Sequence, residues 1–117
     1  MVIPILRIFD LEKAKDFYVN FLGFTYDWDH QFEDGLPVYC QVSLNDIILH
    51  LSEHHGDCSP GAAIRIQVQN VADYHRSLPK DYRFARPGIE QAPWGTPEMT
   101  VTDPFFNRLI FYEAVEL

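Results

Sequence analysis

The same order of elements occurs twice along this chain: an apolar strand, a capped helix and then three more strands. The first helix follows the apolar run "VIPILRIF", with Asp10 as its N-cap and Gly23 as its stop. The second helix follows "AAIRIQVQ", with Asn70 as its N-cap, and ends before Pro79. Two β-α-β-β-β modules in tandem are therefore predicted, which is an α+β fold class.

We place the N-terminal module at about residues 1–53 and the C-terminal module at about 61–117 of a single domain, joined by the polar segment "EHHGDCSPG". The pair Asn45 and Asp46 is typical of a tight hairpin turn. The remaining strands are expected at 24–32, 37–44 and 47–52 in the first module, and at 82–88, 98–103 and 107–113 in the second.

The predicted strands each have one apolar face and one mixed face. In "PVYCQVSL", for example, Cys40 and Val42 share a face, while Gln41 lies on the other. The apolar faces are expected to pack against the helices. The mixed faces are too apolar for bulk water and too polar for a dry core, so curved sheets that enclose a cleft would explain them.

Composition excludes several classes of partner. Nine basic and 17 acidic residues give a formal net charge of −8, which argues against nucleic acid. The two cysteines, Cys40 and Cys58, lack the spacing of a metal site and are expected to be reduced thiols. The sequence has no apolar run of signal or membrane length, so we expect a cytoplasmic protein with no membrane partner.

Three segments together resemble one known family. The opening "VIPILRIFDLEKAKDFYVNFLGF", "EQAPWG" and "TDPFFNRL" are similar to the glyoxalase/bleomycin-resistance/dioxygenase (vicinal oxygen chelate) superfamily, and most of all to its bleomycin-resistance branch. The resemblance spans essentially the whole chain. It implies curved mixed sheets around a cleft, and a homodimer in which both subunits build the clefts.

The chain departs from the bleomycin-resistance pattern at two positions near the expected cleft. Ala92 is inserted where the family usually joins Gln to Pro, and Phe106 stands where Gly is usual. A turn glycine normally signals a positive φ. Either the turn changes type here, or Phe106 is held in a strained conformation.

The superfamily's enzymes use a divalent metal, and the resemblance implies where its ligands would stand. The four positions correspond to Ile3, His50, Ala63 and Ile110. Only His50 can bind a metal, so we expect no metal and no cofactor, and we do not transfer the family's metal enzymology.

Histidines and carboxylates leave alternatives open. His50 could be a hydrogen-bonding group on the cleft floor, a remnant metal ligand, or a half-buried strand histidine satisfied by its neighbours. His54 and His55 are expected on the solvated surface. Glu98, Glu113 and Asp103 could act in acid–base catalysis or be ordinary strand-edge and corner carboxylates. No nucleophile motif is present, and no catalytic residue is predicted.

A binding cleft is predicted from the mixed faces and from aromatic side chains in less regular segments, which would form its rim. Flat aromatic rings suit planar parts of a ligand, and a cationic group would suit both the rings and the acidic surface. Ile3, Ile5 and Arg7 of the first strand would also face this cleft. The residues predicted to bind the ligand are Trp28, Phe32, Tyr39, Gln41, His50, Arg65, Trp94, Ile110 and Tyr112.

Three functional hypotheses follow. The first is a metal-free homodimeric protein that sequesters a partly aromatic, antibiotic-like small molecule, as in antibiotic resistance. The second is a metal-dependent lyase, isomerase or dioxygenase of the glyoxalase superfamily that uses His50. The third is a metabolite-binding module without a role in resistance. We favour the first, because three of the four metal positions are apolar.

Overall fold

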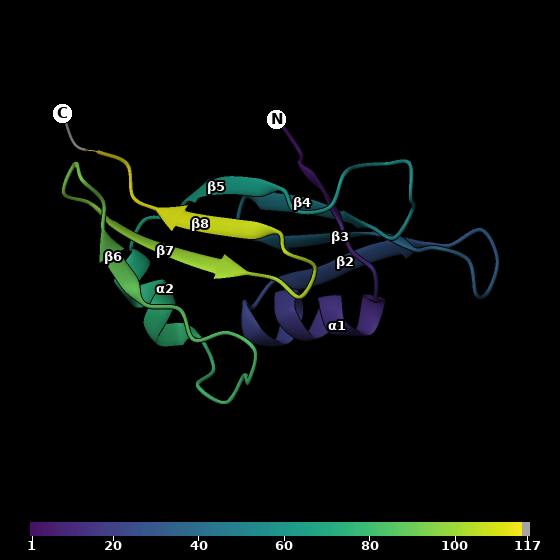
Figure 1. Ribbon diagram of the computed structural model, residues 1–117, viewed down its shortest axis with the longest axis horizontal. Coiled ribbons are helices and arrows are strands. Elements are labelled where there is room, and N and C mark those ends of the chain that lie inside the picture. Colours follow the sequence, from purple (N-terminus) through teal and green to yellow (C-terminus); the bar gives the residue numbers. More distant parts are fainter. Residues whose placement is uncertain (116–117) are drawn as a thin grey trace.

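The computed structural model describes residues 1–115 and has the predicted tandem architecture (Figure 1). The N-terminal module comprises β1 (Ile5–Arg7), α1 (Leu11–Lys15), the π-helical segment η1 (Asp16–Phe21), β2 (Thr25–His30), β3 (Tyr39–Leu44) and β4 (Ile47–Ser52). The C-terminal module comprises β5 (Ala63–Gln67), α2 (Val71–Ser77), β6 (Ile89–Gln91), β7 (Pro97–Thr102) and β8 (Arg108–Tyr112).

Each module forms its own four-stranded mixed sheet. The strand orders are β1-β4-β3-β2 and β5-β8-β7-β6, so the two sheets repeat one topology. In each sheet the first strand pairs in parallel with the last, and the other pairs are antiparallel. The predicted α+β fold with two β-α-β-β-β modules is therefore confirmed. Both helices lie on the same side of the sheets, seen below them in Figure 1.

The first helix begins and ends where the sequence predicts. The carboxylate of Asp10 accepts a hydrogen bond from the Lys13 backbone N–H at 2.9 Å, and Gly23 has a φ of 83°. Between them the helix widens into a π-helical segment, where the Leu22 N–H donates to the Phe17 carbonyl at 2.9 Å. The widening was not predicted, since helical spacing alone does not distinguish the two geometries.

The strand predicted at 82–88 is wrong. Residues 78–88 contain no helix or strand, and the second strand of this module is β6. Pro79 and Pro87 lack the backbone N–H that a ladder needs, which disfavours pairing along the segment. Tyr82 instead anchors it by side-chain packing: its ring stacks on Phe21 with centroids 4.4 Å apart.

The apolar faces of both sheets and the helices form one continuous core, as the alternation predicted. Cys40, Val42, Leu49 and Leu51 are buried in the first sheet, while their neighbours Tyr39, Gln41 and His50 are only partly buried. The mixed faces are thus left outside this core. The core contributions of the second sheet come from Ile66, Met99, Val101, Leu109 and Phe111.

The corner between β7 and β8 joins the two modules. Asp103 is buried, and its carboxylate accepts hydrogen bonds from the backbone N–H groups of Phe105 and Asn107, both at 2.8 Å. It also accepts one from the Tyr18 hydroxyl at 2.7 Å, and Asn107 donates to the Arg7 carbonyl at 2.8 Å. The C-terminal module is therefore tied to both the helix and the first strand of the N-terminal one.

Phe106 stands where the bleomycin-resistance pattern usually has glycine, and its backbone has a conformation that favours glycine. Its φ is 71°, in the left-handed region, and its side chain is 77% exposed. The hydrogen bonds of Asp103 hold the turn in this geometry. Of the two alternatives raised by the sequence, the strained conformation is the one that occurs.

Candidate functional site

Most of the residues predicted to bind a ligand fall into two groups, one associated with each sheet. We call Trp28, Tyr39, Gln41 and His50 the N-terminal cluster. We call Arg65, Trp94, Glu98 and Tyr112 the C-terminal cluster. No hydrogen bond, ion pair or ring contact within residues 1–115 joins one cluster to the other.

Strand register brings the N-terminal cluster together. Gln41 of β3 lies opposite His50 of β4, and on its other side it lies opposite Trp28 of β2. An irregularity between Tyr26 and Trp28 shifts the register of β2. This shift could not be predicted from alternation, which treats β2 as a regular strand.

Hydrogen bonds link the polar groups of the N-terminal cluster in one direction. Gln41 donates from Nε2 to the Asp27 carboxylate at 3.1 Å, so its Oε1 faces Nε2 of His50 at 3.0 Å. His50 must then donate from Nε2, and its Nδ1 accepts the Tyr39 hydroxyl proton at 2.6 Å. Burial lowers the pKa of His50 below its usual 6.5, which favours the neutral ring that this pattern requires. The Tyr39 oxygen is left with acceptor capacity only.

The aromatic rings of the same cluster pack against one another and remain accessible. The Trp28 ring lies nearly parallel to the Tyr39 ring, with centroids 6.1 Å apart and 15° between the planes. It meets the His50 ring edge-on at 5.3 Å. Trp28 is nevertheless 43% exposed. The hydrogen-bonded side chains of Tyr39 and His50 therefore support an indole ring that a ligand can contact.

The C-terminal cluster is built around a cation. The guanidinium of Arg65 pairs with both carboxylate oxygens of Glu98, the closer at 2.9 Å, and this partner raises the pKa of Arg65. The same guanidinium lies 4.5 Å from the Tyr112 ring centroid and 5.8 Å from that of Trp94. Ile110 is half-buried beside them and is the register partner of Arg65.

Trp94 stands at the tip of the β6–β7 turn. The Gly95 N–H donates to the Ala92 carbonyl at 2.8 Å, and the Ala92 N–H donates to the Thr96 carbonyl at 2.9 Å. This tight turn accommodates the inserted Ala92 and leaves Trp94 54% exposed. A cavity of about 280 Å³ lies beside it, lined in part by Glu98, Pro93 and Thr100.

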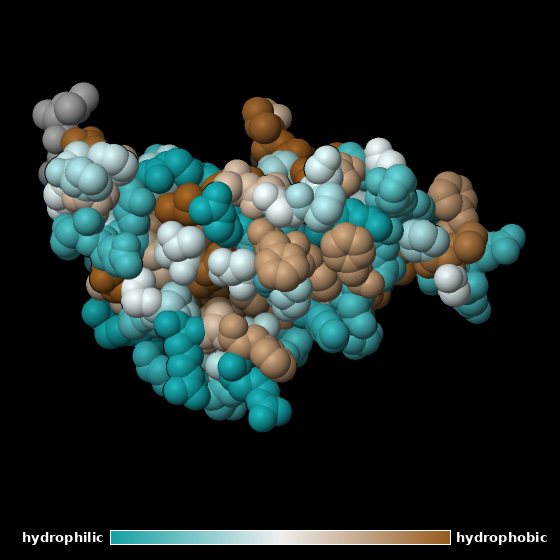
Figure 2. All heavy atoms as spheres, in the orientation of Figure 1, coloured by the Kyte–Doolittle hydropathy of each residue, from teal (hydrophilic) through white to brown (hydrophobic). Residues whose placement is uncertain are grey.

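Several predicted residues stand apart from both clusters. Phe32 is 75% exposed, and its ring meets the His30 ring edge-on at 4.8 Å. Ile3 and Ile5 are 36% and 39% exposed, whereas Arg7 is buried against the Phe9 ring. Figure 2 shows apolar and aromatic atoms across the middle of one face, among polar ones.

The sequence did not assign Asp27 and Glu98 to the binding surface, although each completes one cluster. The signal for Glu98 was present, because alternation from the buried Met99 places it on the mixed face. Asp27 lies at the irregularity in β2, where alternation gives no assignment. Of the loop histidines expected on the surface, His55 is exposed and His54 is half-buried.

The residues present do not fit the divalent metal that the family implies. Ile3, Ala63 and Ile110 carry no ligand atom, and both ring nitrogens of His50 are engaged in hydrogen bonds. Within the described chain, no three His, Cys, Asp or Glu side chains are grouped so that they could hold a metal ion. Residues 1–115 also include no helix long and apolar enough to cross a membrane.

A comparison with protein families assigns the whole chain to one family. A family model described as "Glyoxalase superfamily protein" matches residues 1–117. Comparison with curated proteins gave no significant match.

Solved structures share the fold along nearly their full length. The bleomycin resistance determinant of transposon Tn5 is 17% identical, with a TM-score of 0.74 and 99% and 98% of the two chains covered. A glyoxalase/bleomycin resistance protein from Streptomyces sp. CB03234 is 25% identical, with a TM-score of 0.74 and coverage of 95% and 97%. The bleomycin-binding protein of Streptomyces verticillus, solved with copper(II)-bleomycin, is 25% identical, with a TM-score of 0.69 and coverage of 97% and 95%.

Proposed function

This chain belongs to the glyoxalase superfamily, and we propose that it is a binding protein that sequesters a partly aromatic, antibiotic-like small molecule without a bound metal. The structurally similar bleomycin-binding protein and bleomycin resistance determinant support a role of this kind. The proposed binding surface consists of the N-terminal and C-terminal clusters.

The single observation that carries the proposal is the accessible Trp28 ring, which packs on the hydrogen-bonded pair Tyr39 and His50. Tyr39 and His50 fix the ring from two sides, so a planar ligand group can stack on it with little loss of side-chain entropy. The Tyr39 oxygen, restricted to acceptance, would favour an N–H or O–H donor at the edge of that group.

The charge around this ring suits a cationic ligand group. Residues 27–38 contain no lysine or arginine, and their acidic residues are Asp27, Asp29, Glu33 and Asp34. A cation held over an indole ring is attracted by the ring as well as by nearby carboxylates. In the C-terminal cluster, by contrast, Glu98 neutralises the charge of Arg65. This cluster would therefore contact a ligand through its aromatic rings rather than through a net charge.

A homodimer would complete the cleft. Ile5, Trp28 and Trp94 are each more than a third exposed in one chain, although large apolar side chains on a mixed face are usually covered. Because no hydrogen bond, ion pair or ring contact within residues 1–115 joins the two clusters, we propose that a second copy brings the N-terminal cluster of one subunit opposite the C-terminal cluster of the other.

The test is a titration with metal-free and copper(II)-loaded bleomycin, followed by tryptophan fluorescence. We expect saturable quenching, and a loss of affinity of at least about tenfold for Trp28→Ala and Trp94→Ala. Phe84→Ala is the matched control, since Phe84 is 73% exposed and lies outside both clusters.

Four results would contradict the proposal or a part of it. Unchanged fluorescence at high micromolar drug argues for a metabolite-binding module instead. If Trp94→Ala binds bleomycin with unaltered affinity, Trp94 does not belong to the rim of the binding cleft. Stoichiometric Fe, Mn, Ni or Zn that survives dialysis of untagged protein argues for the metal-dependent alternative. Light scattering after gel filtration tests the dimer, and a monomer at micromolar concentration contradicts it.

A further inference from the structure

A second cavity lies on the helix side of the molecule, away from both clusters. It has a volume of about 310 Å³ and sits between the end of η1 and the segment that connects α2 to β6. Its lining includes no residue of either cluster. Phe21, His75, Leu78, Pro79, Lys80, Ala85, Arg86 and Pro87 line it.

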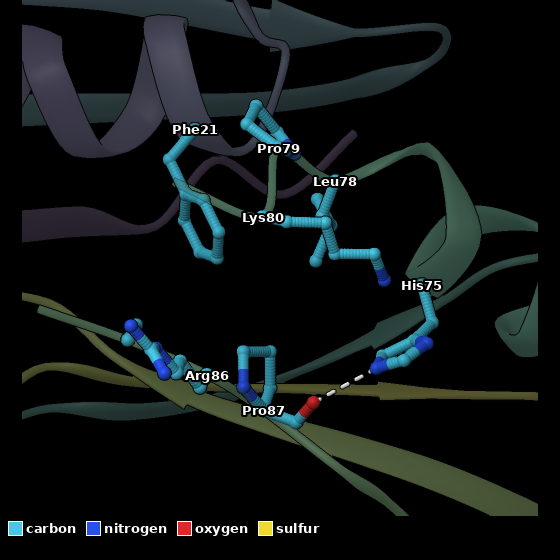
Figure 3. A pocket seen from close by; sticks show the side chains of 8 residues that line it. Phe21, His75, Leu78, Pro79, Lys80, Arg86 and Pro87 are labelled. Carbon is cyan, nitrogen blue, oxygen red and sulfur yellow. Dashed lines mark hydrogen bonds between the residues drawn. The ribbon is translucent and has the colours of Figure 1, made fainter. Parts of the chain in front are cut away.

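Five of the eight residues that line this cavity are apolar, and its walls are held in place. Phe21 and Leu78 are buried, and Figure 3 shows Phe21 and Pro87 facing each other across the opening. The connecting segment is fixed at two points. Tyr82 stacks on the Phe21 ring, and His75 donates from Nε2 to the Pro87 carbonyl at 2.8 Å. The cavity therefore exists without a ligand to order it.

The rim of the cavity is positively charged in an acidic protein. Between residues 76 and 86 the sequence has four basic residues and one acidic residue, whereas the whole chain has a net charge of −8. Arg76 pairs with Asp73, but Lys80 and Arg86 form no ion pair within residues 1–115. In Figure 3 the Lys80 side chain extends toward His75, and Arg86 lies at the opposite end.

No acidic residue of the described chain lines this cavity. Asp16 and Asp81 line a neighbouring cavity on the other side of Phe21 and Pro79, together with Arg83. The positive charge of Lys80 and Arg86 is thus available to a ligand. Guanidinium and ammonium groups bind carboxylates by charge-assisted hydrogen bonds. A guanidinium group can donate two such hydrogen bonds to the same carboxylate.

We propose that this cavity is a second ligand site, for a small organic carboxylate with a compact apolar body about the size of a phenyl ring. The apolar side chains would hold the ring, and either Lys80 or Arg86, which lie at opposite ends of the cavity, would hold the carboxylate. The volume lies at the lower end of the range for small-molecule sites, which limits the ligand to this size. An inorganic anion would leave the apolar floor unused.

The experiment is a titration of ¹⁵N-labelled full-length protein with benzoate, followed by backbone amide shifts. Saturable shifts are expected at the amides of Leu78, Lys80, Ala85 and Arg86, with a Kd on the order of 1 mM for a ligand of this size. Benzyl alcohol keeps the ring without the charge, and acetate keeps the charge without the ring. Each should bind about tenfold more weakly or not at all.

Variants separate this site from general surface charge. Lys80→Gln/Arg86→Gln should weaken benzoate binding by about tenfold, because both cations that could pair with the carboxylate are removed. Arg83→Gln removes one charge from the same segment but not from this cavity, and should leave the affinity within about twofold. Both sets of side chains are exposed, so the fold is expected to persist, which the amide spectrum itself reports.

The outcomes are distinct from those of the bleomycin experiment. Unchanged bleomycin binding by Lys80→Gln/Arg86→Gln, together with lost benzoate binding, supports two separate sites. Equal shifts with acetate or phosphate, an equal loss in Arg83→Gln, or benzoate shifts centred on Trp28 and His50 would each overturn the proposal. Failure of bleomycin to bind leaves the benzoate result unaffected.

Discussion

The hydroxyl of Tyr18 donates a 2.7 Å hydrogen bond to Oδ2 of Asp103, and both side chains are buried where the two modules meet. Burial and the adjacent carboxylate raise the pKa of Tyr18, so the phenol remains the donor across the ordinary pH range. A carboxylate in such surroundings depends on its donors, because an unsatisfied buried charge is strongly destabilising.

Tyr18→Phe is therefore expected to lower the free energy of unfolding by about 1–3 kcal/mol, measured by urea denaturation. Tyr26→Phe is the matched control. It removes the same group from the exposed Tyr26–Asp29 bond and should cost less than about 1 kcal/mol. Equal effects of the two substitutions would show that the buried hydrogen bond contributes no more to the free energy of unfolding than the exposed one.

Phe106→Gly is expected to stabilise the protein by about 0.5–1 kcal/mol. Glycine adopts the φ of 71° without strain, and the exposed phenyl ring gives up little buried area. Phe106→Ala keeps a Cβ at this φ and should show no such gain. Thermal unfolding of the three proteins decides the matter, and a stability order with Ala above Gly would contradict the strain.

His50 should titrate below its usual value of 6.5, because burial disfavours the charged ring. Since the folded-state pKa is depressed, the stability linked to His50 is fully present above pH 6.5 and is lost as the pH falls through the folded-state value. NMR of the imidazole Cε1–H measures the midpoint directly. His50→Gln should flatten the pH dependence of stability between 6.5 and that midpoint, and an unchanged slope would exclude this source.

The two thiols should differ in reactivity with a disulfide reagent such as DTNB at pH 8. Cys40 is fully buried, and burial raises its pKa to about 11, so about one molecule in a thousand carries the thiolate at that pH. Cys58 is partly exposed, and burial raises its pKa to a smaller extent. One equivalent should react rapidly and disappear in Cys58→Ser, with Cys40 reacting only on unfolding. Two rapid equivalents would contradict the burial of Cys40.

Local features of the fold could be predicted from the sequence because their physics is local. Asp10 and Asn70 cap their helices through side-chain bonds that span three residues, and Gly23 ends the first helix through its own φ. Strand alternation separated the buried Cys40 from the partly exposed Gln41 for the same reason.

Features that depend on distant partners were missed. The segment 82–88 has the composition of a strand, but Tyr82 packs on Phe21 from the other module, and this contact replaces a ladder. Alternation placed Tyr39, Gln41 and His50 on one face, yet it could not supply Asp27, which reaches Gln41 only across the shifted register of β2. It also could not show that no hydrogen bond, ion pair or ring contact within the described residues joins the two clusters.

The 2.8 Å hydrogen bond from Asn107 to the Arg7 carbonyl has a consequence for synthesis on the ribosome. The carbonyl belongs to β1, and its partner lies 100 residues later in the sequence. The strands of the N-terminal module can pair with one another early, but this carbonyl stays without its native partner until the corner between β7 and β8 has been synthesised. Final docking of β1 against this corner is thus a late step, and a nascent chain stalled before residue 107 should remain open to proteases there.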